Sequence, residues 1–375
     1  MLSWIEISQK AITNNVRTFK QHLNGALPCF VLKSNAYGHG LKEVYKTLEQ
    51  DNPGWISVFY LEEAMKLRTY GYQGQILLLY PVRTSAEIKE VTRLAADMII
   101  SNTDTLQKWI EAPQKPRAHI KIDTGLSRLG FKPEEFHAVL DQILPFSDKL
   151  VGILTHFANI EDVSKQDYGM KQIREFNQCL HIAKKKKLNL LQHASASAAA
   201  MLLNDLAHYD MCRIGISLYG LWPSDLTRLS FLANNKKSFT ISPVLSWKTR
   251  IVEIQNIQKD TYVGYGCSFK STKNMKIAIL PVGYHDGYPR NLSNGGHAYV
   301  LCRERICKIL GRICMNMMII DISDNPNIKQ DDIVTLIGVD GKEDLSADLI
   351  ASWSGTINYE VLSRIHQSIE RKVIV

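Results

Sequence analysis

A lysine that follows a strongly apolar segment is the first residue of this sequence placed to do chemistry. Lys33 comes directly after the apolar run at 28–32 and precedes a turn with glycines at positions 38 and 40. Burial lowers the pKa of a lysine from its usual ~10.4, because the charged form loses solvation. The neutral amine can then form a Schiff base with an aldehyde. The structural alternative is a lysine that lies along a strand edge with its ammonium group in water.

Other residues that could contact a ligand, through a polar side chain or a backbone amide, stand at the ends of later apolar runs in the same way. They are Lys121, Asp123, Arg128, His156, His193, Ser197, Arg213, Gly215 and Ile216. Ser197 begins an alanine-rich helical segment, and helix N-termini attract anions. Ser197 and the backbone amides of Gly215 and Ile216 therefore suit a phosphate group. An ordinary helix cap at Ser197 and a turn glycine at Gly215 are the structural alternatives.

The elements that must position these residues alternate along the first ~220 residues, apolar runs being followed by amphipathic segments of helical period. The runs lie at 28–32, 55–59, 75–79, 96–100, 117–122, 150–155, 189–193 and 209–214. Strict alternation predicts parallel strands with crossover helices. Eight such units favour a (β/α)8 barrel, whose active site lies at the carboxyl ends of its strands. An open doubly wound sheet is the alternative.

The pattern of apolar and polar residues changes after a predicted linker at 222–239. Strand-like runs separated by turn residues fill 240–375, with a short helix near 345–353. The predicted fold is an N-terminal (β/α)8 barrel followed by a mainly β domain. The expected domain boundaries are 1–230 and 231–375.

Composition excludes several classes of protein. The chain has 375 residues, 45% of them hydrophobic, a net charge of +8 and 7 cysteines. No C-x-x-C pair occurs, so we expect reduced thiols, no structural metal site and a cytoplasmic protein. The N-terminus lacks a leader pattern and no apolar run is long enough to span a membrane. The basic run at 184–187 is interpreted as a solvated helix end, and no nucleic-acid-binding motif accompanies it.

A Schiff-base lysine and a phosphate site at the same barrel end indicate pyridoxal phosphate (PLP) as cofactor. The sequence also resembles the alanine racemase family of fold-type III PLP enzymes over almost its full length. The matching segments are KSNAYGHG (33–40), KIDTGLSRLGF (121–131), THFAN (155–159), RIGISLYG (213–220), GYG (264–266), GYHDGYPR (283–290), GRICMNMM (311–318) and TINYEVLSRI (356–365). They occur in the order typical of the family.

The resemblance implies racemisation of L- and D-alanine for peptidoglycan, by two bases. Lys33 would carry PLP and serve as one base, and Tyr265 would reach the opposite face from the partner subunit of a homodimer. Racemisation needs this arrangement, because a proton leaves one face of the α-carbon and another arrives on the opposite face. Tyr265 needs nearby positive charge to ionise near neutral pH, and His156 and Arg213 are the candidates for that coupling.

The remaining roles are also implied by the resemblance. Tyr37, Tyr359, Ser197, Gly215 and Ile216 would bind the phosphate, Arg213 the pyridine nitrogen, Arg128 and the amide of Met315 the substrate carboxylate, and Tyr284 and Arg290 the entrance from the partner subunit. Lys121 would orient Arg128, and this lysine is carbamylated in some members of the family. An arginine can only donate a hydrogen bond, so the pyridine nitrogen would stay unprotonated and the cofactor would be a weaker electron sink.

The sequence departs from the typical family pattern at two positions, and three hypotheses about its function compete with the racemase. Asn316 and Glu161 stand where the family commonly has aspartate, which leaves carboxylate affinity and access open. A broad-specificity racemase and a fold-type III decarboxylase are rivals among enzymes; the decarboxylases typically have a glutamate at the pyridine nitrogen. A PLP-binding barrel without catalysis is the third rival, and such proteins lack a β domain. Serine is a possible slow substrate, because a methyl pocket discriminates by only ~1–3 kcal/mol.

Overall fold

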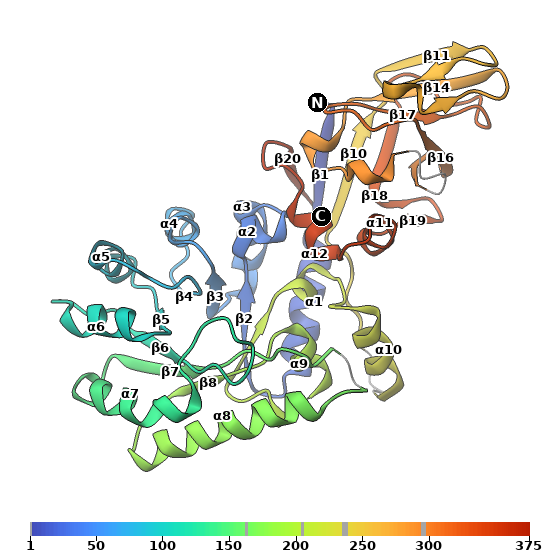
Figure 1. Cartoon of the computed structure of the whole chain (residues 1–375). Helices are drawn as coiled ribbons and strands as arrows, with labels where there is room; N and C mark the ends of the chain where they lie inside the picture. The colour runs from blue at the N-terminus through green and yellow to red at the C-terminus, as the bar shows by residue number, and fades with distance from the viewer. Residues whose placement is uncertain (1, 162–163, 204–205, 235–238, 294–297) are drawn as a thin grey trace. The chain divides into compact units, whose positions relative to one another are not determined.

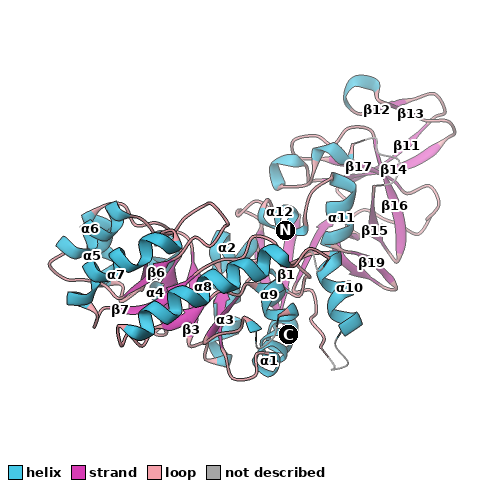
Figure 2. Ribbon diagram, turned by 60° about the horizontal axis from the view of Figure 1, so that its bottom comes forward, coloured by secondary structure: helices cyan, strands magenta, loops and turns pink. Residues whose placement is uncertain are grey.

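The chain forms two compact units. The computed structural model describes residues 2–161, 164–203, 206–234, 239–293 and 298–375. Ala11–Ser34 and Tyr45–Ser242 form one unit, which we call the barrel unit. Met1–Lys10, Asn35–Val44 and Pro243–Val375 form the other, which we call the β unit. Figures 1 and 2 show the elements of each.

Eight parallel strands form the barrel. They are β2 (Leu27–Val31), β3 (Trp55–Val58), β4 (Gln75–Leu78), β5 (Met98–Ile100), β6 (Ala118–Lys121), β7 (Leu150–Leu154), β8 (Leu191–His193) and β9 (Met211–Ile214). Each lies within one of the apolar runs of the sequence or overlaps it by all but one residue.

The ring of strands closes through two seams. One sheet has the order β4-β3-β2-β9 and the other β5-β6-β7-β8. At the first seam Leu77 and Asp97 form a parallel bridge. At the second, the Asp210 amide donates to the Gln192 carbonyl at 3.0 Å. The prediction of a (β/α)8 barrel is confirmed.

Helices connect successive strands. They are α1 (Gln9–His22), α3 (Leu41–Leu48), η1 (Glu49–Asp51), α4 (Leu61–Thr69), α5 (Ser85–Arg93), α6 (Thr103–Glu111), η2 (Pro133–Glu135), α7 (Phe136–Ile143), η3 (Leu144–Phe146), α8 (Asp167–Lys185), α9 (Ser197–Leu202), η5 (Ile216–Tyr219) and α10 (Asp225–Asn234). The expectation that 222–239 is a linker is wrong in part, because α10 occupies its centre. Phe231 of α10 is buried and packs against Trp222, which explains why a helix forms there.

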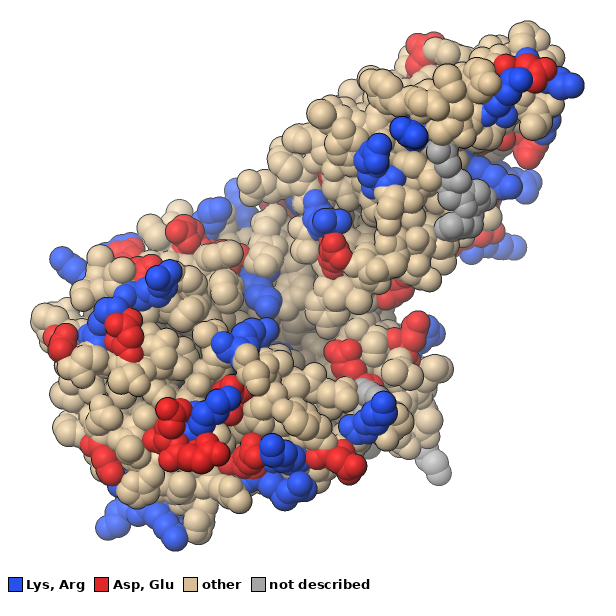
Figure 3. Space-filling view, viewed as in Figure 1, with Lys and Arg blue, Asp and Glu red and all other residues tan. Residues whose placement is uncertain are grey.

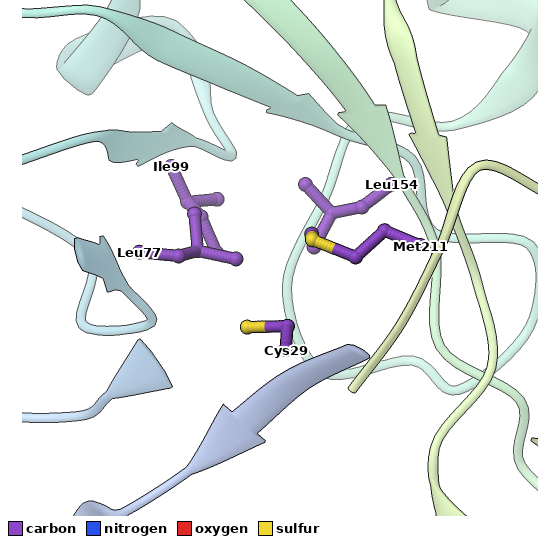
Figure 4. Close-up of a cluster of buried hydrophobic side chains, with 5 residues drawn as sticks. All are labelled: Cys29, Leu77, Ile99, Leu154 and Met211. Carbon is purple, nitrogen blue, oxygen red and sulfur yellow. The ribbon is translucent and has the colours of Figure 1, made fainter. Parts of the chain in front are cut away.

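One layer of apolar side chains fills the barrel interior. Cys29, Leu77, Ile99, Leu154 and Met211 come from five strands and are all buried. Figure 4 shows these side chains pointing toward one another inside the ring. Burial raises the pKa of the Cys29 thiol to about 12, so at neutral pH Cys29 serves as a small apolar side chain.

The β unit is built on a ten-stranded sheet of order β11-β14-β17-β16-β15-β18-β10-β1-β20, with β19 paired to β18. Its strands are β1 (Ser3–Ser8), β10 (Leu245–Arg250), β11 (Glu253–Ile257), β14 (Met275–Leu280), β15 (Tyr299–Cys302), β16 (Arg305–Leu310), β17 (Met318–Asp321), β18 (Ile333–Asp340), β19 (Glu343–Leu345) and β20 (Glu370–Ile374). A separate hairpin pairs β12 (Tyr262–Val263) with β13 (Phe269–Lys270). Its helical segments are α2 (Lys33–Tyr37), which begins in the barrel unit, η6 (Tyr265–Cys267), η7 (Tyr284–Asp286), η8 (Arg290–Leu292), α11 (Ala347–Ser354) and α12 (Asn358–Ser363).

The first strand accounts for one difference from the expected domains 1–230 and 231–375. β1 pairs antiparallel with β10 and parallel with β20. These backbone hydrogen bonds place the first ten residues in the β unit, although they precede the whole barrel in the sequence. The mainly β character expected for 240–375 is confirmed, as is the helix expected near 345–353.

Charged side chains are mixed on the surface. The face in Figure 3 carries lysine and arginine interspersed with aspartate and glutamate. Among the described residues no helix is both long and apolar enough to cross a membrane.

The apolar layer predicts a large difference between two leucines of the barrel. We expect Leu77→Ala to lower the free energy of unfolding by about 2–5 kcal/mol, because it leaves a cavity among buried side chains. Leu27→Ala is the control, since Leu27 is 45% exposed, and it should cost about 0.5 kcal/mol. Urea unfolding followed by tryptophan fluorescence measures both; equal losses would contradict the assignment of Leu77 to the core.

Candidate functional site

Polar side chains gather at the carboxyl ends of the barrel strands. Lys33 follows β2 and is half-buried. Burial lowers its pKa, and the positive charges of Arg128 and Arg213 lower it further, while Glu63 opposes the change. The amine of Lys33 is therefore more readily neutral than that of a surface lysine, as its position in the sequence predicts.

The backbone after Lys33 makes a turn of left-handed conformation. Ser34, Asn35, Ala36 and Tyr37 all have φ between +53° and +55°. Each such residue with a side chain costs roughly 1–2 kcal/mol, so neighbouring contacts must hold the turn in place. Among these contacts, the ring Nδ1–H of His39 donates to the carbonyls of Ala36 and Tyr37, each at 3.1 Å.

Further contacts hold the same turn within the β unit. The Asn35 Oδ1 accepts the amide of Leu41 at 2.9 Å. The guanidinium of Arg371 donates to the Gly38 carbonyl at 3.0 Å. Gly38 has a φ of +84°, and a Cβ there would lie 2.1 Å from the Leu362 carbonyl oxygen. Only glycine fits this position, because any side chain would collide with Leu362. The close contacts that offset the strain of the turn therefore depend on Gly38.

Two helix N-termini meet in the barrel unit. Ser197 is the first residue of α9, and its Oγ accepts the backbone amide of Gly215 at 3.1 Å. Gly215 precedes the 3₁₀ helix η5, which begins at Ile216. Backbone amides at helix N-termini have no partner inside the helix and carry partial positive charge. Ser197, Gly215 and Ile216, three of the five residues expected to bind phosphate, thus lie together, and we call them the candidate anion-binding set.

Arg213 lies on β9 and is buried. Its Nη1 donates to the His193 ring Nδ1 at 2.7 Å and to the His193 carbonyl at 3.1 Å. Its Nη2 donates to the carbonyls of Thr155 and Ala194, each at 2.9 Å, and to the His156 Nδ1 at 3.2 Å. Burial lowers the pKa of Arg213 to about 10, so it stays protonated at neutral pH. Its Nε makes no hydrogen bond with a described residue and remains available as a donor.

The two histidines beside Arg213 are neutral at physiological pH. Burial lowers the pKa of His156 well below its usual value, and the charges of Arg213 and Lys121 lower it further. Burial and the Arg213 charge do the same to His193. Each imidazole therefore accepts a hydrogen bond from Arg213 through an unprotonated nitrogen.

Lys121 and Arg128 differ in their environments. Lys121 ends β6 and is buried, and burial together with the charges of Arg213 and Arg128 lowers its pKa to about 7. Arg128 lies in the loop that follows and is exposed. Among the described residues it forms no hydrogen bond or ion pair, so its guanidinium can take an anionic ligand. Asp123, between them, accepts Lys132 Nζ at 2.8 Å.

Tyr37 and Tyr359 come together within the β unit, although they lie near opposite ends of the sequence. Their ring centroids are 6.1 Å apart with an interplanar angle of 50°. Tyr359 belongs to α12, and Tyr37 ends the left-handed turn. Burial raises the pKa of Tyr37, so its phenol stays protonated and can donate a hydrogen bond.

Tyr265 stands on an exposed turn of the β unit. It is 70% exposed and lies between Gly264 and Gly266, whose φ angles are +73° and +70°. Both glycines have the left-handed conformation that a side chain disfavours. The flanking glycines noted in the sequence thus shape the turn that presents the tyrosine.

The loop that carries Met315 and the 3₁₀ helix η7, which begins at Tyr284, are joined by backbone hydrogen bonds. The Tyr284 amide donates to the Cys314 carbonyl at 3.1 Å, and the His285 amide to the Met315 carbonyl at 2.9 Å. The guanidinium carbon of Arg290 lies 6.0 Å from the centroid of the Tyr284 ring. The Met315 side chain is 55% exposed. Asn316 and Glu161, the two departures, are also exposed.

The site residues therefore form two groups. Lys33, Lys121, Arg128, His156, Ser197, Arg213, Gly215 and Ile216 belong to the barrel unit, and Tyr37, Tyr265, Tyr284, Arg290, Met315 and Tyr359 to the β unit. The sequence analysis missed two buried polar residues that continue from the first group, Asp97 and His119. The alternation of Arg117, His119 and Lys121 in an otherwise apolar strand draws attention to His119 alone, because alternate residues share one side of a strand; it gives no sign of Asp97, which lies before β5, or of the contact between the two.

Comparison with known families gives matches to both units. A model described as "Alanine racemase, N-terminal domain" matches residues 7–223, and one described as "Alanine racemase, C-terminal domain" matches residues 244–373. Together they span nearly the whole chain.

Individual relatives match over nearly their full lengths. The chain is 41% identical to the alanine racemase of Leptospira interrogans serogroup Icterohaemorrhagiae serovar Lai, covering 99% of this chain and 96% of the relative. It is 34% identical to that of Methanococcus maripaludis, covering 98% and 97%. The crystal structure of alanine racemase from Bacillus anthracis with bound L-Ala-P has a TM-score of 0.90 at 29% identity, covering 100% of this chain and 95% of the other.

The left-handed turn predicts unequal effects of two glycine substitutions. Gly25→Ala adds a side chain at a φ of +99° where no atom lies within 4 Å, so it should lower Tm by only about 2–4 °C. Gly38→Ala adds the clash with the Leu362 carbonyl to a similar φ cost, so we expect a loss at least twice as large. Differential scanning calorimetry measures both; equal losses would mean that the turn can move away from Leu362.

Proposed function

The chain belongs to the alanine racemase family, and from this premise we propose that it is a PLP-dependent enzyme that interconverts L- and D-alanine by two bases. The observation that carries the proposal is a half-buried Lys33 with a lowered pKa in the same barrel unit as Arg213 and the candidate anion-binding set of Ser197, Gly215 and Ile216. Matches in both units argue against a barrel without a β domain. Arginine at position 213 argues against the decarboxylases, which typically have glutamate there.

The described residues fit PLP. Its phosphate suits the helix N-termini at Ser197 and Ile216, and the phenols of Tyr37 and Tyr359 would add donors. The Nε of Arg213 is a donor without a described partner and would face the pyridine nitrogen. The Lys33 amine would hold the aldehyde carbon. When bound, PLP withdraws electrons from the α-carbon of the substrate and so makes its proton easier to remove.

Lys33 and Tyr265 are the proposed proton carriers. The Nζ of Lys33 would take or give the α-proton on one face, and its lowered pKa makes the neutral amine available for that purpose. The phenol oxygen of Tyr265 would act on the other face. Two different groups are needed because one base on one face would return the proton with unchanged configuration.

Arg213 is proposed to keep the reaction on the path to racemisation. It can donate a hydrogen bond but stays protonated, because its pKa remains near 10. A donor that keeps its proton leaves the pyridine nitrogen unprotonated and the electron sink weak. Rapid return of a proton to the α-carbon is then favoured over transamination.

Arg128 and the Met315 amide are proposed to bind the substrate carboxylate. The exposed guanidinium of Arg128 has the fork geometry that suits a carboxylate. Its positive charge adds to burial and to the charge of Arg213 in lowering the pKa of Lys121. Tyr265 and Tyr359 would crowd the methyl group. Such a pocket discriminates by only ~1–3 kcal/mol per methylene, so serine is expected to react slowly.

A homodimer with shared active sites is part of the proposal. Tyr265 and Met315 are 70% and 55% exposed in the single chain, which suits residues that complete the site of a second copy. Tyr284 and Arg290 would line the entrance to that site. The proposed role is cytoplasmic supply of D-alanine for peptidoglycan.

Incubation with L-alanine in deuterated water tests the reaction. We expect D-alanine carrying one α-deuterium, and release of CO2 instead would indicate a decarboxylase. Lys33→Ala should lose the visible absorbance of bound PLP and reduce turnover by roughly 10³-fold or more. Lys46→Ala is the control, since Lys46 is an exposed lysine paired with Glu49. A Lys33→Ala variant that kept its colour and activity would refute the assignment.

Mixing two inactive variants tests the shared site. In a heterodimer of Lys33→Ala and Tyr265→Ala chains, one site receives both substitutions and the other receives neither, if Lys33 and Tyr265 act from different chains. Refolding the pair together should restore about a quarter of wild-type activity, since half the dimers are mixed and half their sites are intact. If both residues acted within one chain, each site would carry one substitution and no activity would return.

A further inference from the structure

A row of buried polar side chains runs through the barrel interior away from Arg213. The Arg213 Nη1 lies 2.7 Å from the His193 Nδ1, the His193 Nε2 lies 2.9 Å from the His119 Nδ1, and the His119 Nε2 lies 3.2 Å from the Asp97 Oδ2. The four residues come from β9, β8, β6 and the segment before β5, and all are buried. None of the roles assigned to the site uses Asp97 or His119.

The residues at the two ends of this row, Arg213 and Asp97, determine which histidine nitrogens carry protons. An arginine can only donate, so the His193 Nδ1 must accept and its proton must be on Nε2. That proton is donated to the His119 Nδ1, so the His119 proton is also on Nε2. An ionised carboxylate can only accept, and Asp97 takes this last proton. Both ends therefore require the same tautomer for both histidines, and each histidine must be neutral.

The barrel leaves room for the contact between the two rings. His119 and His193 are on β6 and β8, with β7 between them. In the β7 register, Gly152 pairs with His119, and a Cβ on Gly152 would lie 2.0 Å from the His119 Nδ1. The absence of a side chain at position 152 is what allows the His119 ring to lie over β7 and reach His193.

Asp97 is fixed at the far end of the row by a second arginine. The Arg117 Nε donates to the Asp97 Oδ1 at 2.8 Å, and its Nη2 donates to the Oδ2 at 2.6 Å. The same Nη2 contacts the Gln75 Oε1 at 2.7 Å. Although burial alone would raise the pKa of Asp97, the hydrogen bonds from His119 and Arg117 lower it. Asp97 is therefore an oriented carboxylate at neutral pH.

We propose that Asp97 is a positioning residue for the reaction: through His119 and His193 it fixes the Arg213 guanidinium so that its Nη1 points into the barrel and its Nε stays available for the cofactor. A reversed His193 tautomer would place an N–H against the Arg213 Nη1–H, and the guanidinium would have to turn away. The inference rests on the proposed function, since it gives Arg213 its role toward PLP.

The first experiment reads the protons directly in the wild-type holoenzyme. With ¹⁵N-labelled histidine and assignment by His119→Gln and His193→Gln, we expect both rings to be neutral with the proton on Nε2 at about pH 7. A protonated Nδ1 or a charged ring at either position would overturn the proposal. This result does not depend on catalysis, whereas the deuterium experiment tests the proposed function, so failure of one is distinguishable from failure of the other.

Two substitutions at position 97 separate orientation from charge. Asp97→Asn keeps an acceptor for His119, so both histidines should keep the Nε2–H tautomer. Asp97→Leu removes the acceptor, so His119 should lose its single tautomer, the absorbance maximum of bound PLP should shift, and kcat should fall about tenfold with little change in KM for alanine. The fall in kcat with Asp97→Asn should be smaller.

A matched ion pair supplies the control. The Asp332 carboxylate accepts hydrogen bonds from the Arg303 Nε at 2.6 Å and from the Arg303 Nη2 at 2.9 Å. Among the described residues no histidine hydrogen-bonds to this pair. Asp332→Asn removes the same kind of pair and should leave the PLP spectrum and kcat unchanged. If Asp97→Leu changed the spectrum and kcat no more than Asp332→Asn does, or if Asp97→Asn reversed the tautomers, the proposal would be wrong. Should Asp97→Leu fail to fold, the wild-type tautomers and Asp97→Asn still decide the question.

Discussion

Positive charge held away from water is the physical constraint on which this site depends. Lys33, Lys121 and Arg213 share one end of the barrel, and burial lowers the pKa of each. The two lysines respond by becoming easier to deprotonate, which suits chemistry at nitrogen. Arg213 instead stays charged, and three backbone carbonyls together with two imidazoles surround its terminal nitrogens. One electrostatic environment thus produces both easily deprotonated amines and a permanent cation.

Most barrel strands could be predicted from the sequence because they are short apolar runs that are buried on both faces, as β4 and β5 are. The partly buried β8 was predicted chiefly from its place in the alternation of strands and helices. The residues at the strand ends followed directly from that prediction. Pairings between distant segments could not be predicted in this way: β1 joins β10 and β20 through backbone hydrogen bonds, which leave no mark on side-chain pattern. The helix α10 was missed because its burial depends on aromatic partners such as Trp222.

Within the site, residue type and place along the chain were enough to predict which residues stand at the carboxyl ends of the barrel strands. Lys33, Ser197 and Arg213 are of this kind. The left-handed turn after Lys33 was not foreseen, because it depends on contacts such as that of Arg371 with the Gly38 carbonyl, made by residues near the other end of the chain. The row from Arg213 to Asp97 was missed for a similar reason, since it passes between strands and has no signature along any one of them.

The glycine at position 152 limits which substitutions such a sequence can accept as it diverges. An alanine there would collide with the imidazole at 119, so the two positions cannot drift independently. A lineage that gained a methyl group on β7 would first have to give up the ring on β6, and with it the bridge between the carboxylate and the guanidinium. Covariation between these two sites in an alignment of relatives would therefore record a steric trade-off.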